Sequence, residues 1–585
     1  MLKQKNFFHS LKLFVPYLAA YPKQLIAAVI LGIASGITSV MMTYYIGVAV
    51  DQMVNQGAVD FPRLFQILQL FVGIFLVTVI SQYFIQRLGN KVAFDSVAKL
   101  RDETFTHLNK LPLSYYDQSS KGDIVSRFTN DMDNISTAIS AVFNQVFSGM
   151  TVVLVALIFM LYLSPLLTLV VLVATPIIFL LTYIVAKTSQ QYFTSQQKLV
   201  GSISGFITEM VGNQKIVKAF QREEQNQKNF EALNQELYVR GQKAQFASSL
   251  TNPSSRFVDH LAYLMVGLVG GLLALKTNSG VTIGIISSFT IYSSQFTKPF
   301  IELSGITIQL QTAIAGLDRS FELLREPVEE PDDSDAVVLK DTYGKVVFDH
   351  VAFSYQKDQP LIENFNLLVQ PGETIAIVGK TGAGKSTLVN LLMRFYEVDD
   401  GRITIDGIDI RHLTRDSLRQ QFGMVLQETW LMDSSLRANL RYGRKSATDE
   451  EIYAALKDAY MYEFVMRLPD KLDTIVGEAG VKLSDGQRQL LTIARTMISR
   501  PPMLILDEAT SSVDTLTERK IQSAFLAMMK DHTSFVIAHR LSTIQNADQI
   551  LVLDHGQIVE IGSHQELLQK DGFYKQLYEA QFSKS

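Results

Sequence analysis

The sequence has no cysteine among its 585 residues, which excludes disulfide bonds and thiolate metal sites. It also has little excess of either charge, with 53 Lys and Arg against 57 Asp and Glu and a net charge of −4. That balance gives no reason to expect a nucleic-acid partner. The lack of cysteine fits a protein whose soluble part lies in a reducing compartment. The length predicts two or three domains rather than one.

Apolar residues are distributed unevenly between the two halves of the chain. Residues 340–585 mix charged and apolar positions as a soluble α/β domain does, whereas residues 1–310 contain long apolar stretches. A helix needs about 20 mostly apolar residues to cross the hydrocarbon core of a membrane. The stretches that meet this requirement are about 24–50, 64–86, 142–163, 166–187, 257–275 and 282–305.

The basic residues predict which ends of these spans lie in the cytoplasm. Segments 87–127 and 188–256 are rich in Lys and Arg, whereas connections 51–63, 164–165 and 276–281 have almost none. The positive-inside rule therefore places the N-terminus, both basic segments and the C-terminal half in the cytoplasm. Both basic segments show helical patterns, which predicts that the membrane helices extend well beyond the membrane.

These patterns predict a multi-domain fold. Residues 1–325 form an all-α transmembrane domain of six spans with long cytoplasmic helix extensions. Residues 326–344 form a linker, because EPVEEPDDSD at its start is acidic, contains proline and has no periodicity. Residues 345–585 form an α/β nucleotide-binding domain of the P-loop type.

The last predicted span has an aromatic face with two possible roles. Phe289, Tyr292, Phe296 and Phe300 fall on one side of a helix. Such a face can line a cavity for amphipathic ligands, or it can pack against lipid or a neighbouring helix. The sequence does not decide between these two interpretations.

A phosphate-binding loop follows the apolar strand pattern of residues 374–378, and a helical pattern follows the loop. In a G-x-x-x-x-G-K-S loop, backbone N–H groups and the helix N-terminus bind the phosphates. Lys385 would bridge the β- and γ-phosphate oxygens, and the Ser386 hydroxyl would bind Mg²⁺. The residues of the loop are Gly379, Lys380, Thr381, Gly382, Ala383, Gly384, Lys385, Ser386 and Thr387.

Residues 503–508, MLILDE, predict a buried parallel strand that ends in two acidic residues. Ligands of parallel sheets bind at the carboxyl ends of the strands, beside the phosphate loop. There Asp507 would hold Mg²⁺, and Glu508 would orient and deprotonate the attacking water. The alternative for this acidic pair is a role in forming a turn.

The segment Leu483-Ser-Asp-Gly-Gln487 resembles the LSGGQ signature of ATP-binding-cassette (ABC) transporters, and it precedes the acidic strand as in that family. A membrane half followed by a cassette in one chain is similar to the half-transporter layout of the bacterial multidrug-type exporters. The resemblance covers essentially the whole chain. Other residues that match the family in order are Tyr355, Gln427, Glu478, Asp514 and His539.

This resemblance implies an ATPase that uses ATP and Mg²⁺ and works as a dimer with a second half-transporter. In the family, each ATP lies between the phosphate loop of one chain and the signature of the other. Tyr355 would stack on adenine, Gln427 would sense Mg²⁺ and the attacking water, and His539 would contact the γ-phosphate. The signature residues that would contact ATP on the partner are Ser484, Asp485, Gly486 and Gln487.

The resemblance also implies export of hydrophobic or amphipathic compounds, drugs or lipids, across the cell membrane by alternating access. Coupling helices near Leu113–Gln118 and Gly212–Lys215 would dock onto the cassettes. An alternative is a membrane-bound regulatory or channel-like ABC subunit without a transport substrate of its own. A soluble cassette ATPase does not account for the apolar spans.

One residue departs from the family pattern. Asp485 replaces a glycine that should approach the γ-phosphate bound to the partner. At about 5 Å and an effective dielectric near 20, two like charges repel by roughly 3 kcal/mol. This repulsion favours a heterodimer with unequal ATP sites over a homodimer that tolerates the change.

Overall fold

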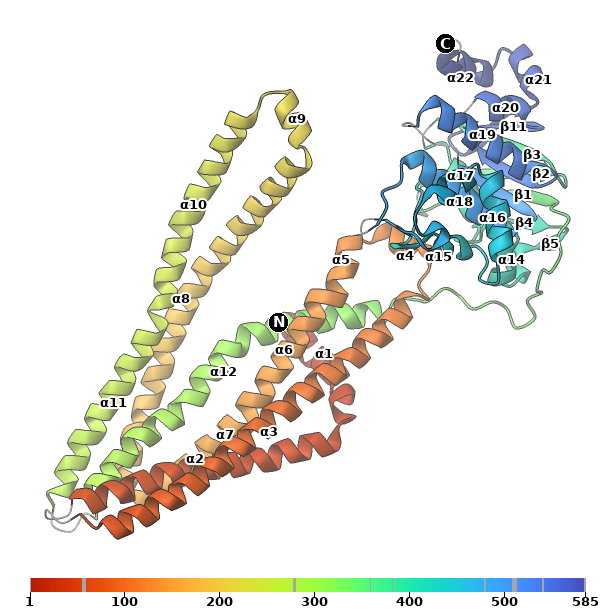
Figure 1. Ribbon diagram of the computed structural model, residues 1–585. Coiled ribbons are helices and arrows are strands. Elements are labelled where there is room, and N and C mark those ends of the chain that lie inside the picture. Colours follow the sequence, from red (N-terminus) through yellow and green to blue (C-terminus); the bar gives the residue numbers. More distant parts are fainter. Residues whose placement is uncertain are drawn as a thin grey trace. The chain divides into compact units, whose positions relative to one another are not determined.

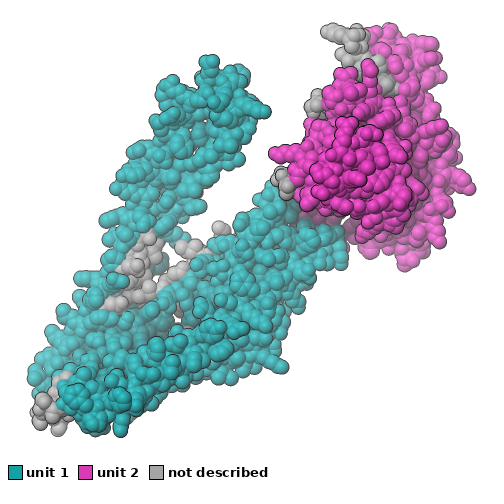
Figure 2. Space-filling model, in the orientation of Figure 1, with its two compact units in different colours: residues 1–110, 119–327 teal, residues 111–118, 328–585 magenta. Residues whose placement is uncertain are grey.

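The computed structural model describes residues 2–54, 59–276, 280–357, 359–380, 382–477, 480–507, 513–538 and 541–582. The chain divides into two compact units, shown in teal and magenta in Figure 2. Unit 1 contains residues 1–110 and 119–327, and unit 2 contains residues 111–118 and 328–585. Residues 111–118 belong to unit 2, although the sequence analysis assigned them to the transmembrane domain of residues 1–325. The predicted domain boundaries stay a prediction.

All described elements of unit 1 are helices (Figure 1). Ser164 begins α8 by accepting a hydrogen bond from the backbone N–H of Leu167, and Pro165 occupies the first helical turn. The break at Ser164 confirms the predicted turn between the third and fourth apolar stretches. The helices are α1 Leu2–Ala19, α2 Pro22–Val54, α3 Phe61–Leu108, α5 Lys121–Ser126, η1 Arg127–Asp131, α6 Met132–Val142, η2 Phe143–Phe147, α7 Ser148–Leu163, α8 Pro165–Gly212, α9 Gln214–Ala219, α10 Glu223–Ser249, α11 Thr251–Ala274 and α12 Ile283–Leu323.

Within the described residues, three helical stretches are long and apolar enough to cross a membrane. They are Pro22–Met53, Phe61–Leu108 and Lys121–Leu163, and two shorter apolar stretches are Pro165–Ile177 and His260–Ala274. The predicted spans at 166–187, 257–275 and 282–305 include residues whose side chains are not described. The total of six spans therefore stays a prediction.

The aromatic face of α12 lies in the helical core of unit 1. Phe289 and Tyr292 are 0% exposed and Phe296 is 6% exposed. They pack with Val40 of α2 and Met160 of α7, and the Tyr292 hydroxyl donates a hydrogen bond of 3.0 Å to the carbonyl of Val40. The structure therefore decides between the two interpretations of this face: these three side chains pack against neighbouring helices.

The described strands of unit 2 form a six-stranded sheet in the order β12-β11-β3-β10-β9-β6, a four-stranded antiparallel sheet in the order β2-β1-β4-β5 and a two-stranded antiparallel sheet of β7 and β8. In the larger sheet only β12 is antiparallel to its neighbour. The strands are β1 Val346–Phe353, β2 Ile362–Val369, β3 Thr374–Gly379, β4 Asp400–Ile405, β5 Ile408–Asp409, β6 Phe422–Val425, β7 Ser434–Ser435, β8 Ile475–Val476, β9 Met503–Asp507, β10 Thr533–Ile537, β11 Gln549–Asp554 and β12 Gln557–Gly562.

Strands β3, β9 and β11 of the larger sheet are buried on both faces, which explains why their sequences are nearly continuously apolar. Along β9, Leu504 and Leu506 face one core, whereas Met503 and Ile505 face the other. The described helices of unit 2 are α4 Leu113–Gln118, α13 Lys385–Leu392, η3 Ile410–His412, α14 Arg415–Gln420, α15 Leu436–Arg441, α16 Asp449–Asp458, α17 Tyr462–Arg467, η4 Lys471–Asp473, α18 Asp485–Ser499, α19 Thr515–Met529, α20 Leu541–Asn546, α21 His564–Gln569 and α22 Phe573–Phe582.

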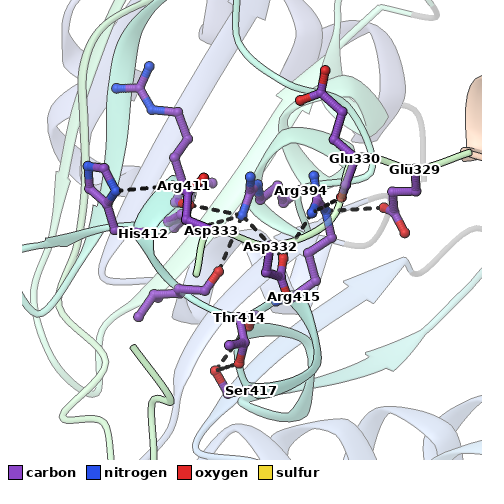
Figure 3. A network of polar contacts seen from close by, with 12 residues as sticks. Glu329, Glu330, Asp332, Asp333, Arg394, Arg411, His412, Thr414, Arg415 and Ser417 are labelled. Carbon is purple, nitrogen blue, oxygen red and sulfur yellow. Dashed lines mark hydrogen bonds and ion pairs between the residues drawn. The ribbon is translucent and has the colours of Figure 1, made fainter. Parts of the chain in front are cut away.

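The acidic part of the predicted linker binds a cluster of arginines in unit 2 (Figure 3). The Arg415 side chain is 8% exposed, and its Nη1 donates to the Glu330 carbonyl at 2.6 Å and to the Asp332 carboxylate at 2.9 Å. Arg419 pairs with Glu329 at 2.7 Å. The backbone N–H of Val337 then donates to the carbonyl of His412 at 2.8 Å. This acidic segment is therefore held on unit 2 by charge as well as by backbone hydrogen bonds.

We expect Arg415→Met to lower the stability of unit 2 by about 2–3 kcal/mol. The change removes the closest donor of the Asp332 carboxylate and of the Glu330 carbonyl. The loss is smaller than for a fully buried pair, because the neighbouring carboxylates keep Arg394 and Arg419 and are partly exposed. Urea unfolding of the full-length chain, followed by fluorescence of Trp430, measures it, because Trp430 is the single tryptophan and lies in unit 2. Lys445→Met, at an exposed position of the same unit, is the control. Equal unfolding midpoints for the two variants would contradict a stabilising role.

Candidate nucleotide-binding site

The phosphate loop joins the end of β3 to the start of α13 and has the backbone that its glycines permit. Gly382 has φ +84° and Gly384 has φ +97°, in the left-handed region that side chains disfavour. At Gly379, a Cβ atom would lie 2.3 Å from the carbonyl oxygen of Leu553 on the neighbouring strand. The loop therefore requires glycine at these positions. The sequence motif and the observed turn agree.

Lys385 begins α13 and its side chain folds over the loop. Its Nζ donates to the carbonyl of Gly379 at 2.7 Å and to the carbonyl of Lys380 at 3.0 Å. Burial lowers the pKa of Lys385, and the negative charge of Asp507 acts in the opposite direction. The ammonium group therefore lies at the mouth of the loop, where a phosphate can replace the carbonyls as its partner.

The register of the large sheet brings the predicted site residues to one edge. Ile537 of β10 pairs with Ile377 of β3 on one side and with Asp507 of β9 on the other. Gln427 follows β6, whose Val425 pairs with Leu506, and its side chain is exposed. In parallel sheets ligands bind at this carboxyl edge. The phosphate loop, Asp507 and Gln427 therefore follow strands that end at the same edge.

Three predicted site residues lie outside the described part of the chain. They are Thr381 of the phosphate loop, Glu508 and His539. Glu508 directly follows Asp507 in sequence, and His539 follows Ala538 after the end of β10. Their roles stay predictions.

The residues present fit Mg²⁺ bound together with a nucleotide. Ser386 is exposed in the first turn of α13, and Asp507 ends β9. Within the described ranges there is no cluster of three or more His, Asp or Glu side chains that could hold a metal. Mg²⁺ in nucleotide sites commonly uses one or two protein oxygens together with phosphate oxygens and water. A hydroxyl and a carboxylate beside a phosphate loop match that chemistry.

Tyr355, predicted to stack on adenine, lies beside α4. A cavity of about 560 Å³ is lined by Ser114, Asp117, Gln118, Ser354, Tyr355, Gln356 and Tyr396. The Tyr355 ring meets the Tyr396 ring edge-on with centroids 5.1 Å apart, and its hydroxyl donates to Thr387 Oγ1 at 3.2 Å. The Tyr396 hydroxyl in turn donates to the Asp117 carboxylate at 2.5 Å. The segment predicted to be the first coupling helix thus contacts the aromatic wall of the candidate adenine site.

Sequence reasoning missed Tyr396, and it placed Asp117 in a predicted coupling helix without assigning it a partner. Burial and the Asp117 carboxylate both raise the pKa of Tyr396, so the phenol keeps its proton and donates a hydrogen bond to the Asp117 carboxylate. Neither residue belongs to a motif, and they are separated by 279 positions in sequence. No local pattern could have paired them.

The signature segment begins helix α18. Ser484 and Gln487 form a capping box, in which the backbone N–H of Gln487 donates to Ser484 Oγ and that of Ser484 donates to Gln487 Oε1. A Cβ atom on Gly486 would lie 2.4 Å from the Thr517 side chain of α19, which explains a glycine there. The start of α18 is therefore fixed by capping and by close helix packing.

Asp485 is paired with Arg488, one turn further along α18. Arg488 also donates to the carbonyl of Leu483 at 3.1 Å. The pair is partly exposed, and the N-terminus of a helix itself favours a negative charge. Both effects offset the repulsion that the sequence predicted between Asp485 and a phosphate.

Comparison with known proteins agrees with this geometry. The family model described as ABC transporter transmembrane region matches residues 25–300, and the model described as ABC transporter matches residues 362–511. A fatty acid ABC transporter ATP-binding/permease protein of Mycobacterium tuberculosis is 41% identical, over 90% of this chain and 83% of the relative. The putative multidrug export protein YgaD of Bacillus subtilis is 34% identical over 98% of this chain and 99% of its own. The chain belongs to the ABC transporter family.

A solved structure supports the fold of this ABC transporter along its whole length. A bacterial Atm1-family ABC exporter with ATP bound superposes with a TM-score of 0.76 at 28% identity, covering 96% of this chain and 99% of that one. The predicted fold class, a helical transmembrane domain followed by an α/β ABC ATPase domain, is confirmed. So is the predicted activity, an ATPase coupled to transport.

We expect Lys385→Ala to weaken nucleotide binding by about tenfold or more, because it removes a charged donor from the phosphate loop. Equilibrium binding of a fluorescent, non-hydrolysable ATP analogue to the purified chain measures the loss. Lys530→Ala removes an exposed charge from the same unit and is the control. If both variants keep the affinity of the parent chain, Lys385 does not contact the phosphates.

Proposed function

We propose that this chain is one half of a dimeric exporter that moves hydrophobic or amphipathic compounds, drugs or lipids, by alternating access. One observation carries the proposal: a phosphate loop and Asp507 follow strands of the same parallel sheet, in a chain whose other unit is built from long apolar helices. The multidrug-export and fatty-acid names of relatives support this substrate class. The basic segments 87–127 and 188–256 support a cell-membrane protein with its N-terminus and ATPase unit in the cytoplasm.

The proposed hydrolysis step uses residues around the carboxyl edge of the sheet. Mg²⁺, when bound, neutralises charge that develops on the phosphates. Ser386 and Asp507 would hold the ion, and Gln427 would sense it and the attacking water. Glu508 accepts the proton of the attacking water, and His539 contacts the γ-phosphate.

Glu508→Gln should bind ATP with nearly the parent affinity but hydrolyse it about 10²–10⁴ times more slowly, because only the general base is lost. The measurement is steady-state phosphate release by the purified complex in lipid nanodiscs, beside equilibrium nucleotide binding. Glu450→Gln, at an exposed position of α16, is the matched control.

Turnover of Glu508→Gln within a few-fold of the parent would remove Glu508 from the catalytic role. Transport is read separately, from uptake of a fluorescent amphipathic dye into inside-out vesicles. Hydrolysis without uptake of any dye would favour the alternative, a regulatory or channel-like subunit.

The dimer is supported by the exposed apolar end of the α8–α10 hairpin. Val211 is 70% exposed, Ile216 of α9 57% and Phe220 72%, although none lies in a predicted membrane span. Three large apolar side chains gathered around one short helix favour contact with another protein surface. We assign that surface to the second half-transporter, as the predicted coupling helix at Gly212–Lys215 requires.

We further propose that the partner is a different chain and that the two ATP sites are unequal. Asp485 supports this because it adds a carboxylate where the family has glycine, although Arg488 offsets part of its charge. The phosphate loop of this chain then forms the active site with the signature of the partner. Asp485 faces the weaker site.

Expressed alone, the chain should show less than about a tenth of the ATPase activity that appears on co-expression with a second half-transporter encoded beside it. Asp485→Gly should change that activity less than about twofold, because the main site does not use this signature. Phosphate release by both preparations, with size measured by light scattering, tests the prediction. A homodimer of this chain with full activity contradicts the heterodimer and leaves Asp485 as a tolerated change.

A further inference from the structure

A cavity in unit 1 has a polar wall formed by helices that carry the predicted spans. Its volume is about 510 Å³, within the range that holds small organic ligands. Its lining comes from α2, α3, η2, α7 and α12. Amide side chains dominate its polar part, and they are Gln82, Gln86, Asn144, Gln145 and Gln295.

Two irregular helix segments place these amides. The π-helical turn η2, Phe143–Phe147, carries Asn144 and Gln145 and inserts an extra residue between α6 and α7. Single π turns within α-helices occur frequently at functional sites. Pro299 lies inside α12 beside Lys298, where it cannot donate a backbone hydrogen bond, and a Cβ atom on Gly149 would lie 3.0 Å from Pro299. A π turn and an internal proline thus lie in two of the helical segments that line the same cavity.

Two of the amide oxygens can still accept hydrogen bonds. Within the described part of the chain, Gln145 Oε1 and Gln295 Oε1 are buried and accept no hydrogen bond. A buried acceptor without a donor is costly, so most such groups in proteins are satisfied by protein, water or ligand. Both oxygens belong to residues that line this cavity. Both can accept a hydrogen bond from a ligand that carries O–H or N–H groups, as they can from water.

The charges of the cavity are balanced. Lys298 and Glu302, one helical turn apart on α12, both line it and lie 3.8 Å apart from Nζ to Oε1. An anionic ligand would be attracted by Lys298 but repelled by Glu302, and a cationic ligand would meet the reverse. The pair therefore favours a head group without net charge. Ile85, Val152 and Pro299 add an apolar part to the lining.

We propose that this cavity binds the head group of an uncharged amphiphile that carries hydroxyl or amide N–H donors. The donors bond to Gln145 Oε1 and Gln295 Oε1, and the apolar part contacts Ile85 and Val152. The proposal rests on the proposed export function and narrows its substrate class. In this proposal the amide side chains select the substrate. The sequence analysis had considered the aromatic face of α12 as the lining of such a cavity.

Three probes with the same six-carbon chain test the head-group preference. They are N-hexanoyl-N-methylglucamine, which is uncharged and rich in hydroxyl groups, hexanoate, which is anionic, and hexyltrimethylammonium, which is cationic. Each is radiolabelled, and its binding to the assembled transporter in nanodiscs is measured by equilibrium dialysis without ATP, with empty nanodiscs subtracted. We expect the uncharged probe to bind at least about tenfold more tightly than either ion.

Variants locate the binding. Gln145→Leu and Gln295→Leu should each weaken binding of the uncharged probe about tenfold, the loss expected for one hydrogen bond to a buried acceptor. Gln295→Glu keeps acceptor oxygens of similar shape and should retain the hydroxyl-bearing probe while improving binding of the cationic one. Gln69→Leu, at an exposed position of α3 outside the cavity, is the control. Unchanged helix content by far-UV circular dichroism and unchanged size-exclusion elution show that unit 1 of each variant is folded, and unchanged nucleotide affinity shows that unit 2 is intact.

Other results overturn the proposal. Tightest binding of hexanoate would make Lys298 the determinant and the site anionic. Equal binding of the three probes, or no saturable binding, would show that the amides do not select the head group. These outcomes are independent of hydrolysis, because Glu508→Gln transporters should bind the uncharged probe as the parent does. Failure of the Glu508→Gln prediction with intact probe binding would therefore count against the proposed hydrolysis step alone.

Discussion

The parallel register of β3, β10 and β9 is the constraint on which the chemistry of this chain depends. It aligns Ile377, Ile537 and Asp507 across three strands, so the loop after β3 and the carboxylate at the end of β9 reach the same edge of the sheet. The loop itself requires left-handed backbone at Gly382 and Gly384. Lys385 can fold over it only because the loop turns in this way. A shift of one residue in any of these strands would separate the groups that must meet one nucleotide.

Residues 394–397, which follow α13, connect three other parts of unit 2. Arg394 pairs with Glu397 at 2.7 Å, and Glu397 also binds Arg415, which holds the acidic linker segment. Between them, Tyr396 contacts Tyr355 and donates to Asp117 of α4. Four consecutive residues thus connect the linker, the candidate adenine site and the predicted coupling helix. A nucleotide that displaces Tyr355 would act first on Tyr396, and through it on α4.

In unit 1 the aromatic and the amide side chains lie in different places. The aromatic residues of α12 lie in the core, where Tyr292 satisfies its hydroxyl with the carbonyl of Val40. The amides gather around the cavity, where two of their oxygens lack donors in the described structure. This arrangement is consistent with the physics of a membrane, in which apolar side chains pack anywhere but a polar group needs a partner. Unsatisfied amides are therefore a better sign of a ligand site than buried aromatics.

The sequence by itself was enough to predict the fold class, the phosphate loop and the family, because those depend on local signals. Periodicity shows a helix or strand, and Gly379–Thr387 carries its own turn chemistry. Only the tertiary structure could pair Asp117 with Tyr396 and bury Phe289 while exposing the amide of Gln82 to a cavity. These outcomes depend on which helix face meets which neighbour, and on side-chain reach in three dimensions. A one-dimensional pattern describes an apolar or polar face, but only packing decides what that face contacts.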